Sequence, residues 1–388
     1  MPHRYNLALV LSGGVARGAA HLGIIKALFE QGIKPDIYIG SSIGAIIAAM
    51  MAIYDDVDFV IDKYLDFVER YSWLDLADIP LLDKEQIISL SGLMDGERMI
   101  NLVEKETGIS GLKLSQTKKP LYITATDLNS GEEIIFGYPQ EFKFRKRVTC
   151  PPKPSEVPTK VGTKEGRRWK NYYQPVFYPK DIPIAKALRA AIGMPVLFKP
   201  YSMRLKNQKL ALVDGGIRDN CPFRLAAYLP DVKYIVASVL GYAGEQKIDF
   251  NRKDLASIFF QFLDLSTAFS QVGSSAQDAI FSEKNAPIVR IINPGIFSVH
   301  PLALGRSRAI MLSAYRTLRE IFGKFKDMEG FWKPWGRKEA NYFSSPRWKL
   351  QKPGRADSNI FSLTDLKSPL EKELRKKSLK YRLAKLFK

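Results

Sequence analysis

The stretch IGSSIGA, residues 39–45, constrains the fold of this chain more than any other. Within it Gly40, Ser42 and Gly44 form the pattern G-x-S-x-G, a spacing that presents a serine on a sharp turn between a strand and a helix. A side chain at either flanking position would collide where the chain doubles back, and only glycine takes the unusual backbone angles at no cost. The pattern therefore predicts a strand, a strained turn and a helix in succession, with the Ser42 hydroxyl exposed at the turn.

Apolar strands and helical patterns alternate along the chain from its first residues. Residues 5–12 are a short apolar run typical of a buried strand, 14–32 have helical spacing, and 36–40 form a second strand that leads into the Ser42 turn. Further predicted strands cover 121–127, 132–137, 211–216, 234–240 and 286–294, and further predicted helices cover 255–281 and 302–322. This order predicts an α/β fold in which helices cover both faces of one sheet.

The composition is that of a globular chain with a full core. Its 388 residues are 46% hydrophobic and 26% charged. The two cysteines are too few for a disulfide framework, and the N-terminal apolar run is too short for a signal peptide, so an intracellular, reducing setting is expected. The apolar run 43–54 is well short of the roughly 20 residues of a membrane-spanning helix. Any contact with a membrane is therefore expected to be peripheral.

The net charge of +19 is concentrated in two segments. Residues 139–180 carry 11 Lys or Arg against 3 Asp or Glu, and residues 331–388 carry 16 against 5, whereas residues 1–138 carry 12 against 19. The insertion is Pro-rich and lacks periodicity, and the first part of the tail mixes chain breakers with charges. We therefore predict one domain over residues 1–325, which contains a basic, Pro-rich insertion at 139–180, and a basic tail over 326–388.

A second glycine cluster, SGGVARG from Ser12 to Gly18, follows the first predicted strand. Its backbone N–H groups lie at the N-terminus of a helix, which predicts an anion site above the sheet edge. The phosphate-binding patterns fail, because Val15 stands where G-x-G-x-x-G needs its second glycine and no G-K-[ST] follows. In an acyl-transfer enzyme the same donors would stabilise an oxyanion beside Ser42.

A serine hydroxyl at neutral pH needs a base to accept its proton. The histidines available are His3, His21 and His300. A packing or capping role is expected for His21 on the first predicted helix, and a solvated loop position for His300. Asp214 ends an apolar strand and is followed by two glycines, so its carboxylate can approach a serine at the end of another strand. The same D-G-G pattern is also typical of a tight turn.

Four segments, in this order and spacing, resemble the patatin-like phospholipase family, including its bacterial single-domain members: VLSGGVARGAAHLGIIKAL, IGSSIGA, ITATDLNSGE and LVDGGIRDNCPFRLA. The resemblance extends over roughly residues 5–320. It implies a three-layer α/β/α domain and a serine–aspartate dyad, with Ser42 as nucleophile and Asp214 as base. No histidine is then needed, provided that a partly desolvated site raises the pKa of Asp214.

The resemblance also implies an oxyanion hole in the glycine cluster. The residues expected there are Gly13, Gly14, Val15, Arg17 and Gly18. Val15 departs from the glycine usual at its position, which restricts the backbone angles there. The residues expected to shape the nucleophile turn and the turn after the base are Gly40, Gly44, Gly215 and Gly216.

These residues imply a lipid acyl hydrolase of the phospholipase A or lysophospholipase type. Ser42 would attack an ester carbonyl, an acyl-enzyme would form, and water would release the fatty acid. No metal or other cofactor is implied. An acyltransferase would use the same residues with an alcohol in place of water. The basic net charge leaves a nucleic-acid-binding protein with a vestigial hydrolase domain as an alternative of another class.

The tail favours a membrane surface over nucleic acid as the partner. One face of its predicted last helix collects Leu379, Leu383, Leu386 and Phe387. Basic residues surround this face, and the tail tryptophans suit the headgroup region: Trp332, Trp335 and Trp348. We expect a cytoplasmic protein that takes phospholipid or lysophospholipid and associates peripherally with anionic membranes through 331–388, with 139–180 as a further basic segment. Nucleic acid is not an expected partner.

Overall fold

The computed structural model of the chain describes residues 7–72, 94–138, 176–229, 231–241, 286–296, 299–323, 327–332 and 360–363, together with the single positions 75, 258, 262, 263, 266, 325 and 376. The predicted helix at 255–281 lies almost wholly outside these residues, as do most of the basic insertion and most of the tail, including its predicted last helix. What the sequence predicts for those segments stays a prediction.

Strands and helices alternate in chain order, as predicted. The strands are β1 (Leu7–Leu11), β2 (Ile37–Ser41), β3 (Leu121–Asp127), β4 (Glu133–Tyr138), β5 (Val176–Phe177), β6 (Tyr201–Leu205), β7 (Gln208–Asp214), β8 (Tyr234–Ser238), β9 (Ile288–Ile292) and β10 (Ile360–Leu363). The helices are α1 (Ala19–Glu30), α2 (Ile43–Tyr54), α3 (Val57–Arg70), α6 (Glu97–Thr107), α7 (Ile184–Ala191), α8 (Gly216–Asp219), α9 (Phe223–Tyr228), α11 (Ser307–Phe322) and α12 (Met328–Trp332). Short 3-10 turns are η1 (Val15–Gly18), η2 (Leu114–Gln116) and η6 (Leu304–Arg306), so the helix predicted at 302–322 is η6 followed by α11.

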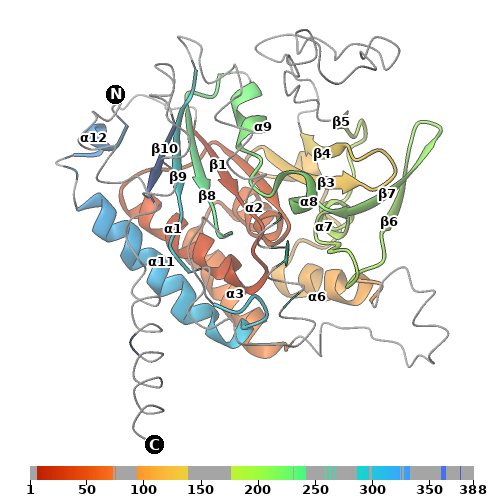
Figure 1. Cartoon of the computed structure of the whole chain (residues 1–388), viewed down its shortest axis with the longest axis horizontal. Coiled ribbons are helices and arrows are strands. Elements are labelled where there is room, and N and C mark those ends of the chain that lie inside the picture. Colours follow the sequence, from red (N-terminus) through yellow and green to blue (C-terminus); the bar gives the residue numbers. More distant parts are fainter. Residues whose placement is uncertain are drawn as a thin grey trace, which may run out of the picture.

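One sheet runs through the molecule, with strand order β10-β9-β8-β1-β2-β3-β4-β5 (Figure 1). The strands from β10 to β3 are parallel to their neighbours, whereas β4 pairs antiparallel with β3. Parallel neighbours need long crossover connections, and the helices of an alternating chain provide them. The predicted α/β fold, with a largely parallel sheet flanked by helices, is confirmed.

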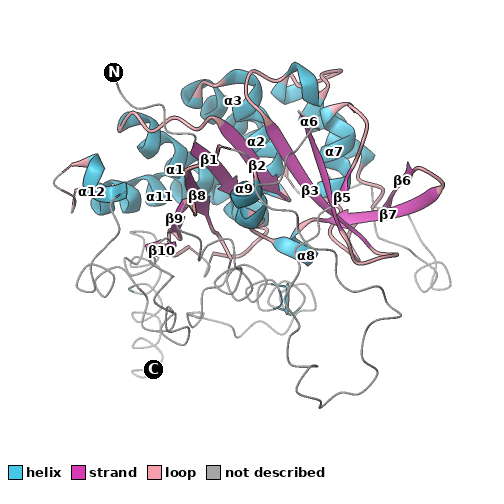
Figure 2. Cartoon of the chain, turned by 90° about the horizontal axis from the view of Figure 1, so that it is seen from above, coloured by secondary structure: helices cyan, strands magenta, loops and turns pink. Residues whose placement is uncertain are grey.

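The two faces of the sheet are covered by different helices, and β1 shows why. Leu7, Leu9 and Leu11 belong to one hydrophobic core with α1, α2, α3, α6, α7 and α11, whereas Ala8 and Val10 belong to a second core with α9. Successive side chains of a strand point to opposite faces. A continuous apolar run such as LALVL is therefore buried on both sides. The helices that flank the sheet can be followed in Figure 2.

Strand β3 changes its partner along one edge. Its first half pairs parallel with β2, up to Ser41 opposite Thr124, and its last residues pair antiparallel with β7, starting from Asp214 opposite Ala125. Because β2 and β7 run toward each other along the same edge, their carboxyl ends meet. The residues that follow β2 and end β7 are thereby brought together.

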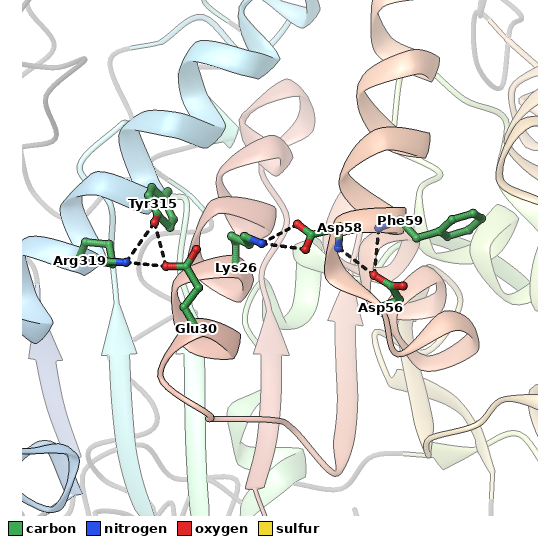
Figure 3. Close-up of polar contacts among 7 residues, drawn as sticks. All are labelled: Lys26, Glu30, Asp56, Asp58, Phe59, Tyr315 and Arg319. Atoms are coloured by element: carbon green, nitrogen blue, oxygen red, sulfur yellow. Dashed lines mark hydrogen bonds and ion pairs between the residues drawn. The ribbon is translucent and has the colours of Figure 1, made fainter.

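Helix α1 is linked to its neighbours α3 and α11 by charged side chains at the surface (Figure 3). Lys26 Nζ lies 2.7 Å from Asp58 Oδ1. On the other side Arg319 Nη1 lies 2.6 Å from Glu30 Oε2, which also accepts a hydrogen bond from Tyr315 Oη. These pairs connect three helices of the same layer across their exposed side.

Two described segments of the predicted tail pack with the sheet. Strand β10 pairs parallel with β9, and Nε of the buried Arg290 on β9 donates to the Phe331 carbonyl of α12. The Trp332 ring is buried, and its centroid lies 4.7 Å from that of Tyr234. The interpretation of Trp332 as a headgroup residue is therefore wrong, because its ring packs inside the protein. In the described part of the chain, none of the helices combines the length and the apolar character needed to cross a membrane.

Candidate active site

Ser42 lies between β2 and α2 in a backbone conformation that few residues adopt. Its φ is 53° and its ψ is −130°, outside the regions allowed to most L-residues. A Cβ on Gly40 would overlap the Gly44 carbonyl oxygen, and one on Gly44 would overlap the Leu11 carbonyl oxygen. The predicted collision is confirmed. The unusual angles, however, belong to Ser42, since neither glycine has a positive φ.

The side chains of Ser42 and Asp214 are in direct contact. Ser42 Oγ donates a hydrogen bond to Asp214 Oδ2 over 2.6 Å. The other carboxylate oxygen, Oδ1, accepts the N–H of Gly216 over 2.8 Å, so both oxygens are held in place. Gly215 is also required sterically, because a Cβ there would overlap the Thr124 carbonyl oxygen. The arrangement places a carboxylate where it can accept the serine proton.

The environment of Asp214 changes its acidity in the direction that a base requires. Burial raises the pKa of Asp214 to about 6, although the hydrogen bonds from Ser42 and Gly216 act in the opposite direction. A carboxylate with this pKa is still mainly ionised at pH 7, and it accepts a proton more readily than an ordinary aspartate does. A base of this kind can act without a histidine.

The glycine cluster lies against Ser42, but its N–H groups are not equally available. The Gly13 N–H donates to both the backbone oxygen and Oδ1 of Asn220, each over 3.1 Å. The N–H groups of Gly14 and Val15 have no acceptor among the described residues. Val15 has a φ of 52°, which a β-branched residue rarely adopts. Of the predicted oxyanion donors, the two that remain available are therefore Gly14 and Val15.

Arg17 and Gly18 make contacts that stabilise the fold around the glycine cluster. The Arg17 side chain is fully buried, its Nε donates to the Val299 carbonyl, and its backbone N–H donates to the Gly14 carbonyl. These contacts hold Arg17 within the fold, and its predicted place in the oxyanion hole stays a prediction. A Cβ on Gly18 would overlap the Ile43 side chain, so this glycine lets η1 pack against the start of α2.

Neither described histidine is hydrogen-bonded to Ser42. His21, on α1, is buried against the carboxyl ends of β1 and β8, where one ring nitrogen contacts the Ser12 carbonyl and the other the Ser238 hydroxyl. Burial lowers the pKa of His21 to about 4, against the effect of the Ser12 hydrogen bond, so its ring is neutral at pH 7. His300 Nδ1 accepts the Leu302 N–H, and His3 lies outside the described residues. Among the described residues, no group of three or more His, Cys, Asp and Glu side chains could hold a metal ion.

Asn220 is a site residue that the sequence reasoning missed. It follows Asp214 by six positions, within the segment that carries the family resemblance, and its side chain is nearly buried. By accepting the Gly13 N–H it ties the glycine cluster to the chain after the base. The only signal in the sequence was this proximity to Asp214, which does not reveal a partner 207 residues away.

Ser42 also lies on the wall between two cavities. The larger, which we call the apolar cavity, contains about 830 Å³ of space, part of it open to solvent, and is lined by Val15, Ser42, Ile43, Ile46, Met50, Tyr64, Phe67, Val68, Met99, Val103, Thr107, Ile192, Met194, Leu197, Phe198, Leu302 and Leu304. The smaller, which we call the glycine-loop cavity, contains about 510 Å³ and is lined by Gly13, Gly14, Val15, Ser42, Met194, Asp214, Gly216, Ile217, Asn220, Gly241, Leu263 and Pro301. Val15, Ser42 and Met194 belong to both cavities.

Comparison with known proteins gives matches over the same region. Residues 9–227 match the family described as "Patatin-like phospholipase". A Bacillus subtilis (strain 168) protein, "Uncharacterized protein YqhO", is 26% identical over 228 residues, which are 56% of this chain and 65% of that protein. "Lysophospholipase NTE1" of Kluyveromyces lactis is 44% identical over 75 residues, which are 19% of this chain and 5% of that protein. The structure of VipD from Legionella pneumophila aligns at 17% identity with a TM-score of 0.38, over 81% of this chain and 67% of that one.

The family match covers more than half of the chain and includes β1, the glycine cluster, Ser42, Asp214 and Asn220. The chain spans less than two thirds of the length of either sequence relative. The extent of the match nevertheless decides the family: the chain belongs to the patatin-like phospholipases.

Proposed function

We propose that this chain is a serine lipid acyl hydrolase that cleaves phospholipid or lysophospholipid esters with a Ser42–Asp214 dyad. The observation that carries the proposal is the 2.6 Å hydrogen bond between the two side chains at the edge of an apolar cavity. Family membership and the short match to a protein named as a lysophospholipase support a lipid ester as the substrate.

The proposed reaction has two halves that use the same groups. Asp214 accepts the proton as Ser42 Oγ attacks the ester carbonyl, and the N–H groups of Gly14 and Val15 stabilise the oxyanion. A single donor of this kind contributes about 3 to 4 kcal/mol to lowering the barrier. Asp214 then returns the proton to the leaving alcohol. In the second half it accepts a proton from the water that attacks the acyl-enzyme and passes this proton to Ser42 Oγ, which leaves as the fatty acid is released.

The experiment compares four variants in the hydrolysis of a soluble ester and of lysophospholipid. Ser42→Ala should abolish activity and labelling by a fluorophosphonate, and Asp214→Asn should lower kcat by about three orders of magnitude or more. Ser41→Ala is the matched control, because Ser41 is the adjacent buried serine on β2. It should keep most of the activity, as should His300→Gln.

Two results would reject the proposed dyad. One is full labelling of the Ser42→Ala variant, and the other is an inactive but folded His300→Gln variant, which would identify another base. Mass spectrometry of the products should detect free fatty acid. Transfer of the acyl group to an alcohol without release of fatty acid would indicate an acyltransferase.

A further inference from the structure

The two cavities at Ser42 differ in the polar residues that line them. The apolar cavity is lined almost wholly by apolar residues, with Ser42, Tyr64 and Thr107 as its residues that carry side-chain oxygens, whereas the lining of the glycine-loop cavity includes Asp214, Asn220 and the glycine cluster beside its apolar residues. An ester bound at Ser42 has one apolar half and one polar half. Each cavity matches one half of such a molecule.

Building on the proposed function, we propose that the apolar cavity binds a single acyl chain along α2, that its depth limits this chain to about ten carbons, and that the glycine-loop cavity receives the alcohol and its polar headgroup. Single-chain esters such as lysophospholipids are then the preferred substrates. A second acyl chain would have to enter the glycine-loop cavity, which the headgroup would already occupy.

The length of the apolar cavity follows from the helices that form it. Ile43, Ile46 and Met50 lie on one face of α2, which begins directly after Ser42. Met50 is eight residues beyond Ser42, which corresponds to about 12 Å along the helix axis. An extended alkyl chain advances roughly 1.25 Å for each carbon–carbon bond of about 1.5 Å, so about ten carbons fill this length.

The far end of the cavity lies where α2 and α6 are joined. Met99, Val103 and Thr107 line the cavity from one face of α6. Tyr54 Oη, at the end of α2, donates to the Thr107 carbonyl over 2.6 Å, and Tyr54 itself does not line the cavity. The two helices therefore end together, and the cavity reaches no further along α2 than Met50.

The test changes the depth of the cavity and measures kcat/KM for p-nitrophenyl esters from butanoyl to palmitoyl. In the unchanged protein, kcat/KM should rise up to the decanoyl ester and not beyond it. Met50→Ala deepens the cavity, so the ratio of myristoyl to decanoyl ester should rise about tenfold. Met51→Ala is the matched control, because Met51 is equally buried on the same helix and does not line the cavity. It should leave this ratio unchanged.

A second variant changes the cavity in the opposite direction. Val103→Phe should lower the ratio of kcat/KM for the decanoyl ester to kcat/KM for the butanoyl ester by about tenfold or more. Circular dichroism checks that each variant is folded. The inference is overturned if Met50→Ala and Met51→Ala change the chain-length profile equally, or if Val103→Phe affects both esters alike.

The same assay separates this inference from the proposed function. If butanoyl ester is hydrolysed in a Ser42-dependent way but the profile is the same in all variants, only the acyl-chain assignment is wrong. If no ester is hydrolysed by the unchanged protein, the proposed function and the inference are both rejected.

Discussion

Three residues at the site are held in states that cost free energy. Ser42 and Val15 have φ values of 53° and 52°, and such strain costs about 1 to 3 kcal/mol for each residue. Asp214 is a buried carboxylate whose charged form is disfavoured by desolvation. Strained and desolvated residues that gather at one place are typical of functional sites, where the rest of the structure maintains them.

The buried carboxylate predicts opposite effects of pH on stability and on activity. The pKa of Asp214 is about 6 in the folded chain, against an ordinary value of 3.8. Between these values the folded state holds more protons than the unfolded state, so the free energy of unfolding falls as pH rises from about 4 to about 6. Asp214→Asn removes the free-energy cost of ionising a buried carboxyl group. The variant should therefore be more stable than the unchanged protein at about pH 8, by on the order of 2 kcal/mol.

Urea unfolding of both proteins at about pH 4 and about pH 8 measures this difference. Activity should change in the other direction, because only the ionised carboxylate accepts the Ser42 proton, and kcat/KM should reach half of its maximum near pH 6. A stability difference between the two proteins that does not depend on pH would show that Asp214 does not titrate as described.

At the scale of elements, α1 and α11 pack with their backbones in close approach at Gly23. A Cβ on Gly23 would overlap the Met311 carbonyl oxygen and lie 2.8 Å from the Tyr315 nitrogen. Gly23→Ala should therefore force the two helices apart and lower the free energy of unfolding by about 2 to 4 kcal/mol, as other overpacked or displaced core contacts do. Urea unfolding at neutral pH measures the loss.

The matched control is Gly305→Ala, since a Cβ there would meet no heavy atom of the described residues within 4 Å, apart from its own short helix and chain neighbours, and its φ is not positive. It should change stability by less than about 0.5 kcal/mol. The ion pairs of Figure 3 should matter less than the close approach, because Asp58 is exposed, Lys26 is partly exposed and surface pairs contribute at most about 1 kcal/mol. Equal losses for Gly23→Ala and Gly305→Ala would contradict this account of the helix packing.

At the scale of the whole molecule, the basic tail must be divided before its role is tested. Trp332 and β10 pack with the sheet, so deletion from residue 331 onward would remove part of the fold. Deletion of 370–388 removes eight Lys or Arg and leaves those segments in place. If this segment binds an anionic membrane, the deletion should weaken co-sedimentation with phosphatidylserine vesicles by up to about 1 kcal/mol for each basic residue lost.

The effect should decrease as salt is raised, because salt screens charges at a surface. Turnover of a soluble ester should be nearly unchanged, whereas hydrolysis of vesicle lipid should be slower. Equal binding of the full-length and shortened proteins to the vesicles would reject the membrane role of the tail, as would a loss confined to DNA binding.

The sequence by itself determined the features that depend on neighbours along the chain. Apolar runs of strand length alternate with helical patterns, and this order alone requires a largely parallel sheet covered on both faces. The steric need for glycine at position 40 is likewise local, since a Cβ there would collide with Gly44 and Ala45 of the same turn. At Gly44 the collision is with Leu11 of β1, a contact that depends on the pairing of β1 with β2.

Only the tertiary structure decided which distant groups meet. Ser42 and Asp214 are 172 residues apart, and they touch because β3 exchanges β2 for β7 along one edge, which no periodicity encodes. For the same reason the sequence did not reveal that Asn220 accepts a hydrogen bond from the Gly13 N–H, that Arg17 is buried, or that Trp332 packs on Tyr234. Local sequence patterns predict whether a side chain is buried. Which distant residue it contacts depends on strand order and on the close packing of the whole domain.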